Sequence, residues 1–132
     1  MIFIEVILPT EIMLKGEYDH IIVPGIDGDF GVDQDHTAFI TKIRPGILNL
    51  YKGDAIEKYV MHDGFVTVDD NKTTIVCEVI EKEHVVDFSR ADESKIRAEK
   101  RIKTNSEDTD VRRAEASLKR ALARLSLQKK EG

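Results

Sequence analysis

Hydrophobic and polar residues alternate along the first two thirds of the chain with the two-residue period of β-strands. β-Branched and aromatic residues recur at alternate positions from Met1 to about Val86, between turns rich in Gly, Pro, Asn and Asp. Because six or more short segments of this kind follow one another, the pattern predicts an all-β sandwich or barrel. The clearest predicted strands are Ile2 to Leu8, Tyr18 to Val23, Ala38 to Ile43, Ile47 to Tyr51, Ile56 to Met61, Phe65 to Val68 and Thr73 to Ile80.

The pattern changes near Asp87, where good helix formers replace the strand residues. Gly and Pro are absent from there until the terminal Gly132, and Ala, Arg, Glu, Lys and Leu dominate. We expect a first helix to about Lys103, a polar break at 104–106 and a second helix. The candidate capping residues are Asp87, Ser89, Asp108 and Thr109. The chain is thus predicted to be a β-sandwich over 1–86 and a helical hairpin over 87–132.

Small apolar residues and arginines form separate lines along the two predicted helices. The apolar lines are Val111, Ala114, Leu118, Ala121 and Leu125 on the second helix, and Ala91, Ala98 and Ile102 on the first. The arginine lines are Arg113, Arg120 and Arg124 on the second helix, and Arg90, Arg97 and Arg101 on the first. Because an alanine contributes less than the ~1.5–3 kcal/mol of a buried leucine, such a hairpin is marginal alone. A ligand or a partner could therefore redirect it.

Charge is unevenly distributed along the chain. The net charge of −5 conceals a basic end, because residues 111–132 carry seven Lys or Arg and two Asp or Glu, whereas residues 1–110 carry 13 and 23. The acidic body argues against general nucleic-acid binding. No apolar run approaches the ~20 residues that a membrane-spanning helix needs, and the N-terminus lacks the features of a signal peptide. We expect a cytoplasmic protein that does not itself span a membrane.

No residue pattern in the sequence indicates catalysis or a metal site. The Gly-rich stretch 23–32 lacks the Gly-Lys-Ser/Thr ending of a phosphate loop, so we interpret it as turns and strand. The four histidines are spread singly, without the spacing or the cysteine cluster of a metal site. Cys77 lies in an alternating strand segment, where a buried structural thiol is expected. A β-sandwich enzyme finds no support in these residues.

Several short motifs together resemble the epsilon subunits of bacterial F-type ATP synthases, over nearly the whole chain. They are Val23-Pro24-Gly25, Gly28-Asp29-Phe30-Gly31-Val32, His36, Arg44-Pro45-Gly46, Gly64-Phe65 with Val68, Arg113-Ala114-Glu115, Leu118-Lys119-Arg120-Ala121 and Arg124-Leu125. The chain departs from the family pattern in two loops. Asp33-Gln34-Asp35-His36 and Ala38 stand where Leu-Pro-Gly-His and a nearby Pro are usual, and Asp63-Gly64-Phe65 stands in place of Gly-Gly-Phe.

The resemblance implies a non-catalytic subunit of the central rotor stalk. A flattened sandwich of about ten strands would bind the gamma subunit and the ring of c subunits, coupling the catalytic head to the proton- or sodium-translocating membrane ring. The complex would lie on the cytoplasmic face of the bacterial inner membrane. An extended hairpin would inhibit ATP hydrolysis by contacting the catalytic head, made of alpha and beta subunits. The basic residues expected to make that contact are Arg113, Lys119, Arg120 and Arg124.

The resemblance further implies ATP as a regulatory ligand, with no cofactor or metal required. In some members of the family the hairpin folds around ATP through a motif of Ile or Leu, Asp, two variable residues, Arg and Ala, and 86–91 here reads Val-Asp-Phe-Ser-Arg-Ala. The candidate ATP-binding residues are Glu81, Asp87, Arg90, Ala91, Arg97, Arg120 and Arg124. The simpler interpretation is that these are solvated charges and that Asp87 caps the helix. A different hypothesis is a free ATP-sensing module that signals to an unrelated partner.

Overall fold

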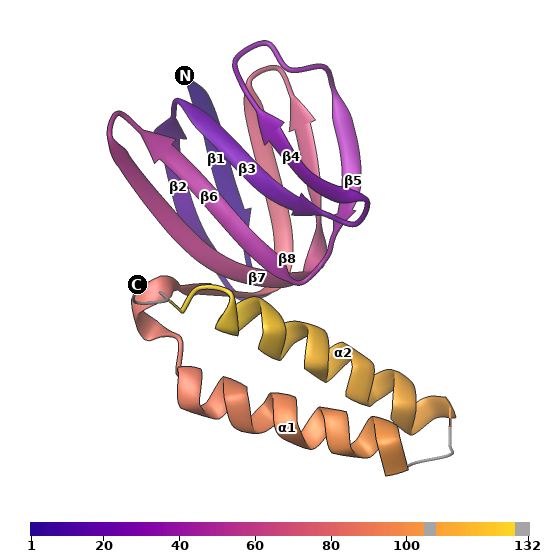
Figure 1. Ribbon diagram of the computed structural model, residues 1–132. Helices are drawn as coiled ribbons and strands as arrows, with labels where there is room; N and C mark the ends of the chain where they lie inside the picture. Colours follow the sequence, from indigo (N-terminus) through magenta and orange to yellow (C-terminus); the bar gives the residue numbers. More distant parts are fainter. Residues whose placement is uncertain (105–107, 129–132) are drawn as a thin grey trace. The chain divides into compact units, whose positions relative to one another are not determined.

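Two compact units make up the chain, one over residues 1–83 and one over 84–132. The computed structural model describes residues 1–104 and 108–128 (Figure 1). Residues 105 and 106, where the polar break is predicted, lie outside the described residues. The side chains of Asp108 and Thr109, the predicted caps of the second helix, also lie outside the description.

The first unit is a β-sandwich of eight strands (Figure 1). The strands are β1 (Ile2–Ile7), β2 (Ile12–Tyr18), β3 (His20–Gly25), β4 (Gly28–Val32), β5 (Phe39–Ile43), β6 (Gly46–Lys52), β7 (Ala55–Asp69) and β8 (Lys72–Lys82). Their order is β2-β1-β8-β7-β5-β3-β4, and β6 pairs with β3 and β7. All pairs are antiparallel except β1 with β8. The predicted sandwich is confirmed, although it has eight strands where the resemblance implied about ten.

Strand β7 joins two segments that the sequence pattern predicted as separate strands, Ile56 to Met61 and Phe65 to Val68. Its first half pairs with β6 and its second half with β5, so one strand serves both layers of the sandwich. The join is at Asp63 and Gly64, where the backbone of Asp63 is left-handed with φ of 57°. A side chain at Gly64 would overlap the carbonyl oxygen of Val76 on β8. Glycine is required here because the backbones of the paired strands β7 and β8 approach each other so closely.

The sandwich core follows the predicted alternation. Ile2, Ile4 and Val6 on β1 are fully buried, and the positions between them are only partly buried. The other large, fully buried side chains of the core include Ile21, Val23, Leu48, Leu50, Met61, Val66 and Ile75. Cys77 is also buried, and burial raises the pKa of its thiol to about 11. The prediction that Cys77 is buried is confirmed, and a raised thiol pKa disfavours the reactive thiolate.

Three of the short motifs that carried the resemblance meet in space at one turn of the sandwich. The guanidinium of Arg44 donates through Nη1 to the carbonyl oxygen of Gly25 at 2.7 Å and through Nη2 to Asp29 at 2.6 Å. Its backbone N–H donates to the carbonyl oxygen of Pro24 at 3.0 Å. A side chain at Gly46 would collide with the ring of Pro24. The motifs therefore form one clamped structure between β3, β4 and β5.

The two loops that depart from the family pattern keep a left-handed backbone. Asp35, which stands where glycine is usual, has φ of 65°, and Asp63 has φ of 57°. Aspartate tolerates this region better than most residues. Asp35 is held further by Asn71, whose Oδ1 accepts from the Asp35 N–H at 2.5 Å and whose Nδ2 donates to Asp35 Oδ1 at 3.3 Å. His62 Nδ1 lies 2.9 Å from Asp63 Oδ2. Side-chain hydrogen bonds thus support conformations that glycine adopts freely.

Candidate functional site

The second unit contains two helices that run side by side in opposite directions (Figure 1). They are α1 (Phe88–Thr104) and α2 (Asp108–Leu125), after a short 3-10 turn over Glu83–Val85. Asp87 caps α1, because its Oδ1 accepts from the backbone N–H of Arg90 at 3.0 Å. The predicted cap at Asp87 is confirmed, and Ser89 lies inside the helix.

Alanines occupy the buried positions of both helices. Within the described residues of α1 and α2, the buried residues are Ala91, Ala98, Ala114, Ala121 and Ala123. Larger members of the predicted apolar lines, such as Ile102 and Leu118, are only partly buried. Small side chains allow the helices to approach closely, but each buries little apolar area. The hairpin is therefore held by a thin contact, as predicted.

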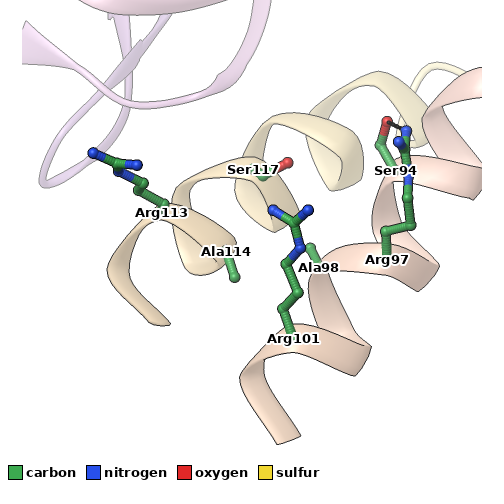
Figure 2. A pocket seen from close by; sticks show the side chains of 7 residues that line it. All are labelled: Ser94, Arg97, Ala98, Arg101, Arg113, Ala114 and Ser117. Atoms are coloured by element: carbon green, nitrogen blue, oxygen red, sulfur yellow. Dashed lines mark hydrogen bonds between the residues drawn. The ribbon is translucent and has the colours of Figure 1, made fainter. Parts of the chain in front are cut away.

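A groove between the two helices collects arginine and serine side chains (Figure 2). Its volume is about 170 Å³, and its lining consists of Ser94, Arg97, Ala98, Arg101, Arg113, Ala114 and Ser117. Residues 94, 97, 98 and 101 lie on one face of α1, and 113, 114 and 117 lie on one face of α2, because positions three or four apart are neighbours on a helix. The small side chains of Ala98 and Ala114 leave space between the helices, and in Figure 2 the guanidinium of Arg113 points away from that of Arg101.

Among the residues that line this groove there is no carboxylate. Arg97 Nη2 lies 3.4 Å from the hydroxyl oxygen of Ser94, which is a long hydrogen bond. Three ion pairs of the sandwich are His20 with Asp33, Arg44 with Asp29 and His62 with Asp63, and none of them involves a residue that lines the groove. The groove therefore presents positive charge without a neutralising side chain from its own lining.

The predicted site residues are only partly brought together. The groove contains Arg97 from the ATP-binding candidates and Arg113 from the inhibitory face. Arg120 and Arg124 are half-buried and each has an interaction partner, so neither is a freely exposed cation. Lys119 is exposed. Of the four residues predicted for the inhibitory face, Arg113 and Lys119 are thus the accessible ones.

The remaining ATP-binding candidates differ in their burial and in their local contacts. Asp87 and Arg90 are at the start of α1 and exposed, and Ala91 is buried, with its N–H donating to the carbonyl oxygen of Asp87 at 3.0 Å. Glu81 belongs to β8 in the sandwich unit, is half-buried and has an interaction partner. Whether these residues bind ATP stays a prediction.

The comparison with known families covers both units. The family described as "ATP synthase, Delta/Epsilon chain, beta-sandwich domain" matches residues 1–83, and "ATP synthase, Delta/Epsilon chain, long alpha-helix domain" matches residues 86–128. An ATP synthase epsilon chain of Desulfitobacterium hafniense is 39% identical over 93% of this chain and 92% of its own length. One of Desulforapulum autotrophicum is 38% identical over 96% and 94%. The chain belongs to the ATP synthase epsilon family.

Solved structures agree on the epsilon fold. A chain in the cryo-EM structure of the Euglena gracilis mitochondrial ATP synthase has a TM-score of 0.84 at 22% identity, covering 92% of this chain and 78% of its own. A chain in the central stalk and c-ring structure of the Tetrahymena thermophila mitochondrial ATP synthase has a TM-score of 0.67 at 15% identity, covering 95% and 94%. At these identities the likeness establishes the fold alone. The predicted membership of the family is confirmed.

The described residues of this epsilon chain form neither a metal site nor a membrane-spanning helix. Residues 1–104 and 108–128 contain no group of three or more His, Cys, Asp or Glu side chains arranged to hold a metal ion. None of the helices described has the length and apolar content to cross a membrane. The groove between α1 and α2 is a candidate binding site of the helical unit.

Sequence reasoning missed three residues of the groove as ligands, namely Ser94, Arg101 and Ser117. Arg101 was placed on the correct face of the first helix but was absent from the ATP-binding pattern. The serines carried a signal that was available, because Ser94 is three residues before Arg97 and Ser117 is four residues after Arg113. Those spacings place each serine on the same helical face as an arginine, and Ser94 with Arg97 is the pair that the structure brings into contact.

Proposed function

We propose that this epsilon chain is a central-stalk subunit that couples the catalytic head of an ATP synthase to its membrane ring. The sandwich would bind the gamma subunit and the c-subunit ring, and the assembled enzyme would lie on the cytoplasmic face of the bacterial inner membrane. Family membership supports this role, as does the naming of a c-ring among the parts of both neighbouring structures. The chain itself would carry out no catalytic step.

We further propose that the hairpin inhibits ATP hydrolysis by contacting the alpha and beta subunits. The observation that carries this role is the alanine contact between α1 and α2, since a helix pair that buries so little area can be rearranged by a few kcal/mol. Arg113 and Lys119 are exposed on α2 and suit acidic segments of a partner. Because exposed ion pairs are each worth ~0–1 kcal/mol, several must act together, and the inhibition should weaken with salt.

Truncation of the reconstituted complex tests the inhibitory role. A chain ending at Val86 keeps every strand of the sandwich and removes both helices. We expect it to assemble with gamma and to raise the rate of ATP hydrolysis relative to the full chain. A double variant, Arg113→Gln with Lys119→Gln, should reproduce part of that rise, whereas Lys95→Gln on α1 is the matched control. Unchanged hydrolysis in the truncated complex would exclude inhibition by the hairpin.

ATP as a regulatory ligand is the second candidate function. The match of residues 86–91 to the family's ATP-binding motif favours it, together with Arg120 and Arg124 on the opposite helix. Isothermal titration calorimetry of the free chain with ATP, compared with Arg120→Ala, tests the binding. The alternative of a free ATP-sensing module requires ATP binding without assembly, so a pull-down with the gamma subunit separates the two. Absence of binding at millimolar ATP would exclude the sensor and leave the stalk role standing.

A further inference from the structure

The imidazole of His20 lies on the outer face of the sandwich, between two neighbouring strands. Ile21 and Val23 on β3 point into the core, so His20 points outward, and its side chain is 34% exposed. A Cβ atom at Gly31 on β4 would lie 2.9 Å from the Cε1 atom of His20, so the glycine makes room for the ring. On the other side, the ring centroid of Tyr51 on β6 is 5.5 Å away. The position of the imidazole is therefore set by both neighbouring strands.

This position brings the imidazole to the carboxylate that begins the next loop. Nδ1 of His20 lies 2.5 Å from Oδ1 of Asp33, the first residue after β4. The antiparallel pairing of β3 with β4 explains the contact, because Ile21 pairs with Val32 and the next residues outward are His20 and Asp33. Asp33 stands where the family pattern has leucine, which has no atom that accepts a hydrogen bond. The contact thus depends on a departure from that pattern.

Asp33 connects His20 to the loop over residues 33–38. The carbonyl oxygen of Asp33 accepts from the N–H of His36 at 3.2 Å, which closes a turn within the loop. Asp35 is held separately by Asn71, in the turn between β7 and β8. The loop is therefore attached to the sandwich through His20 and through Asn71. The first of these attachments contains an imidazole, the side chain whose charge ordinarily changes near neutral pH.

Asp33 is the charged group that contacts the imidazole of His20. The other charged or titratable side chains that pairing with β3 or β6 brings to this face are Tyr51 on β6, Asp29 on β4, which Arg44 engages at 2.6 Å, and Lys58 on β7, which pairs with Asn49. Asp19, the preceding residue on the chain, accepts from the N–H of Gly53 at 2.7 Å. Strand β5 pairs with β3 at Gly25, which is the opposite end of β3 from His20.

We propose that His20 and Asp33 form a pH-dependent clasp on the loop over residues 33–38. When the imidazole is protonated, the clasp is a hydrogen bond between two opposite charges. When the imidazole is neutral, its Nδ1–H donates to the carboxylate without the attraction of a second charge, which is a weaker bond. The added stabilisation of the loop is therefore present at acidic pH and is lost as pH rises and the imidazole loses its proton.

A consequence for the assembled enzyme rests on the proposed stalk function. A stalk subunit with this clasp would present a more rigid loop to its neighbours as the surrounding pH falls. The clasp itself lies within one chain, so it is expected in the free protein whether or not the chain acts in a stalk.

Amide hydrogen exchange of the full-length chain tests the clasp. The N–H groups of Asp35 and His36 report on the loop, and their protection factors correct for the intrinsic effect of pH on exchange. We expect both protection factors to be about twofold to fivefold higher at about pH 5.5 than at about pH 8, as suits a partly exposed ion pair. The imidazole ¹⁵N chemical shifts of His20 should show that its ring gains a proton over the same range.

Matched substitutions separate the clasp from other charges of the loop. Asp33→Asn keeps an acceptor oxygen but removes the negative charge, and it should abolish the difference in protection between the two pH values. Asp35→Asn changes the charge of the loop equally, and asparagine tolerates the left-handed backbone at that position. It should leave the difference in place. His36→Gln should do the same, because the Nδ1 atom of His36 lies 2.6 Å from the carbonyl oxygen of Thr37 and not beside a carboxylate.

The outcomes of these measurements decide the proposal. Loss of the pH difference in both Asp33→Asn and His20→Gln, with its retention in Asp35→Asn and His36→Gln, would support the clasp. Equal protection at the two pH values in the unsubstituted chain would overturn it. A difference that persists in Asp33→Asn, or one that disappears in His36→Gln, would overturn it as well. None of these results would affect the truncation experiment on ATP hydrolysis, so the clasp and the proposed function fail independently.

Discussion

The sandwich and the hairpin differ in what is buried in each. In the sandwich, large aliphatic side chains such as Ile4, Leu48 and Leu50 are completely removed from solvent. In the described parts of the two helices, every buried residue is an alanine. Since hydrophobic stabilisation scales with the apolar area removed from water, the sandwich is a rigid body and the helices are weakly joined. One chain thus combines a strongly stabilised part with a weakly stabilised part.

The largest expected effect is a cavity in the sandwich. Leu50→Ala removes a fully buried side chain from β6 and should cost about 2–5 kcal/mol. Leu122→Ala is the matched substitution on α2, where the side chain is 45% exposed, and it should cost less than ~0.5 kcal/mol. All three tyrosines of the chain lie in strands, so tyrosine fluorescence during urea unfolding measures the cost of Leu50→Ala in the sandwich, whereas helical circular dichroism measures that of Leu122→Ala in the hairpin. Equal costs for the two leucines would contradict the comparison.

The helix cap gives the next largest effect. Asp87→Ala leaves the N–H of Arg90 without its carboxylate acceptor and should destabilise α1 by about 0.5–2 kcal/mol. The loss should appear as reduced helical circular dichroism and faster amide exchange in the first turn of α1, with tyrosine fluorescence unchanged. Ser89→Ala tests the other predicted cap and should have little effect, because Asp87 already fills this role. A change in the sandwich signal would show that the two units are not independent.

The strands and helices were largely predictable because their stabilisation is local or periodic. Alternation over Ile2, Ile4 and Val6 indicated a buried strand face, and the loss of Gly and Pro after Asp87 indicated helices. The continuity of β7 was not predictable in this way. Asp63-Gly64 has the composition of a turn, and it lies within a strand only because β8 pairs on both sides of it. That pairing is a long-range interaction, which periodicity does not report.

The candidate site was predictable only in part, for a different reason. Helical spacing placed Arg97 and Arg101 on one face of the first helix, and both line the groove. It placed Arg113 on one line with Arg120 and Arg124, although of these three Arg113 alone is among the residues that line the groove. Spacing along one helix does not give the register between the helices, which decides that Arg113 and Ser117 line the same groove as Arg97 and Arg101. Alanine contacts carry little register information in the sequence, because alanines two residues apart, such as Ala121 and Ala123, both suit a buried position.

The smallest expected effect concerns a pair of tyrosines that brace one carboxylate in the sandwich. Tyr18 and Tyr59 each donate a hydrogen bond to Glu57 Oε2 at 3.0 Å. Burial, followed by the hydrogen bond to Glu57 and its negative charge, raises the pKa of Tyr18 to about 12 and raises that of Tyr59 as well. Tyr59→Phe removes one donor and should cost about 0.5–1.5 kcal/mol at neutral pH. Tyr51→Phe is the control, because Tyr51 has no part in this cluster.

The stability that the Glu57 cluster gives to the sandwich should depend on pH in the alkaline range, whereas the hairpin contains no tyrosine and should not contribute to this dependence. Because the tyrosine pKa values are higher in the folded state, their stabilisation is complete below the ordinary value of about 10 and is lost as pH rises through about 12. Tyr59→Phe should therefore lose less stability than the unsubstituted chain between those values, measured by urea unfolding followed at strand wavelengths of circular dichroism. The helices contain no tyrosine, so deletion of residues 87–132 should leave this difference in place. An identical pH dependence for Tyr59→Phe and Tyr51→Phe would exclude the Glu57 cluster as its cause.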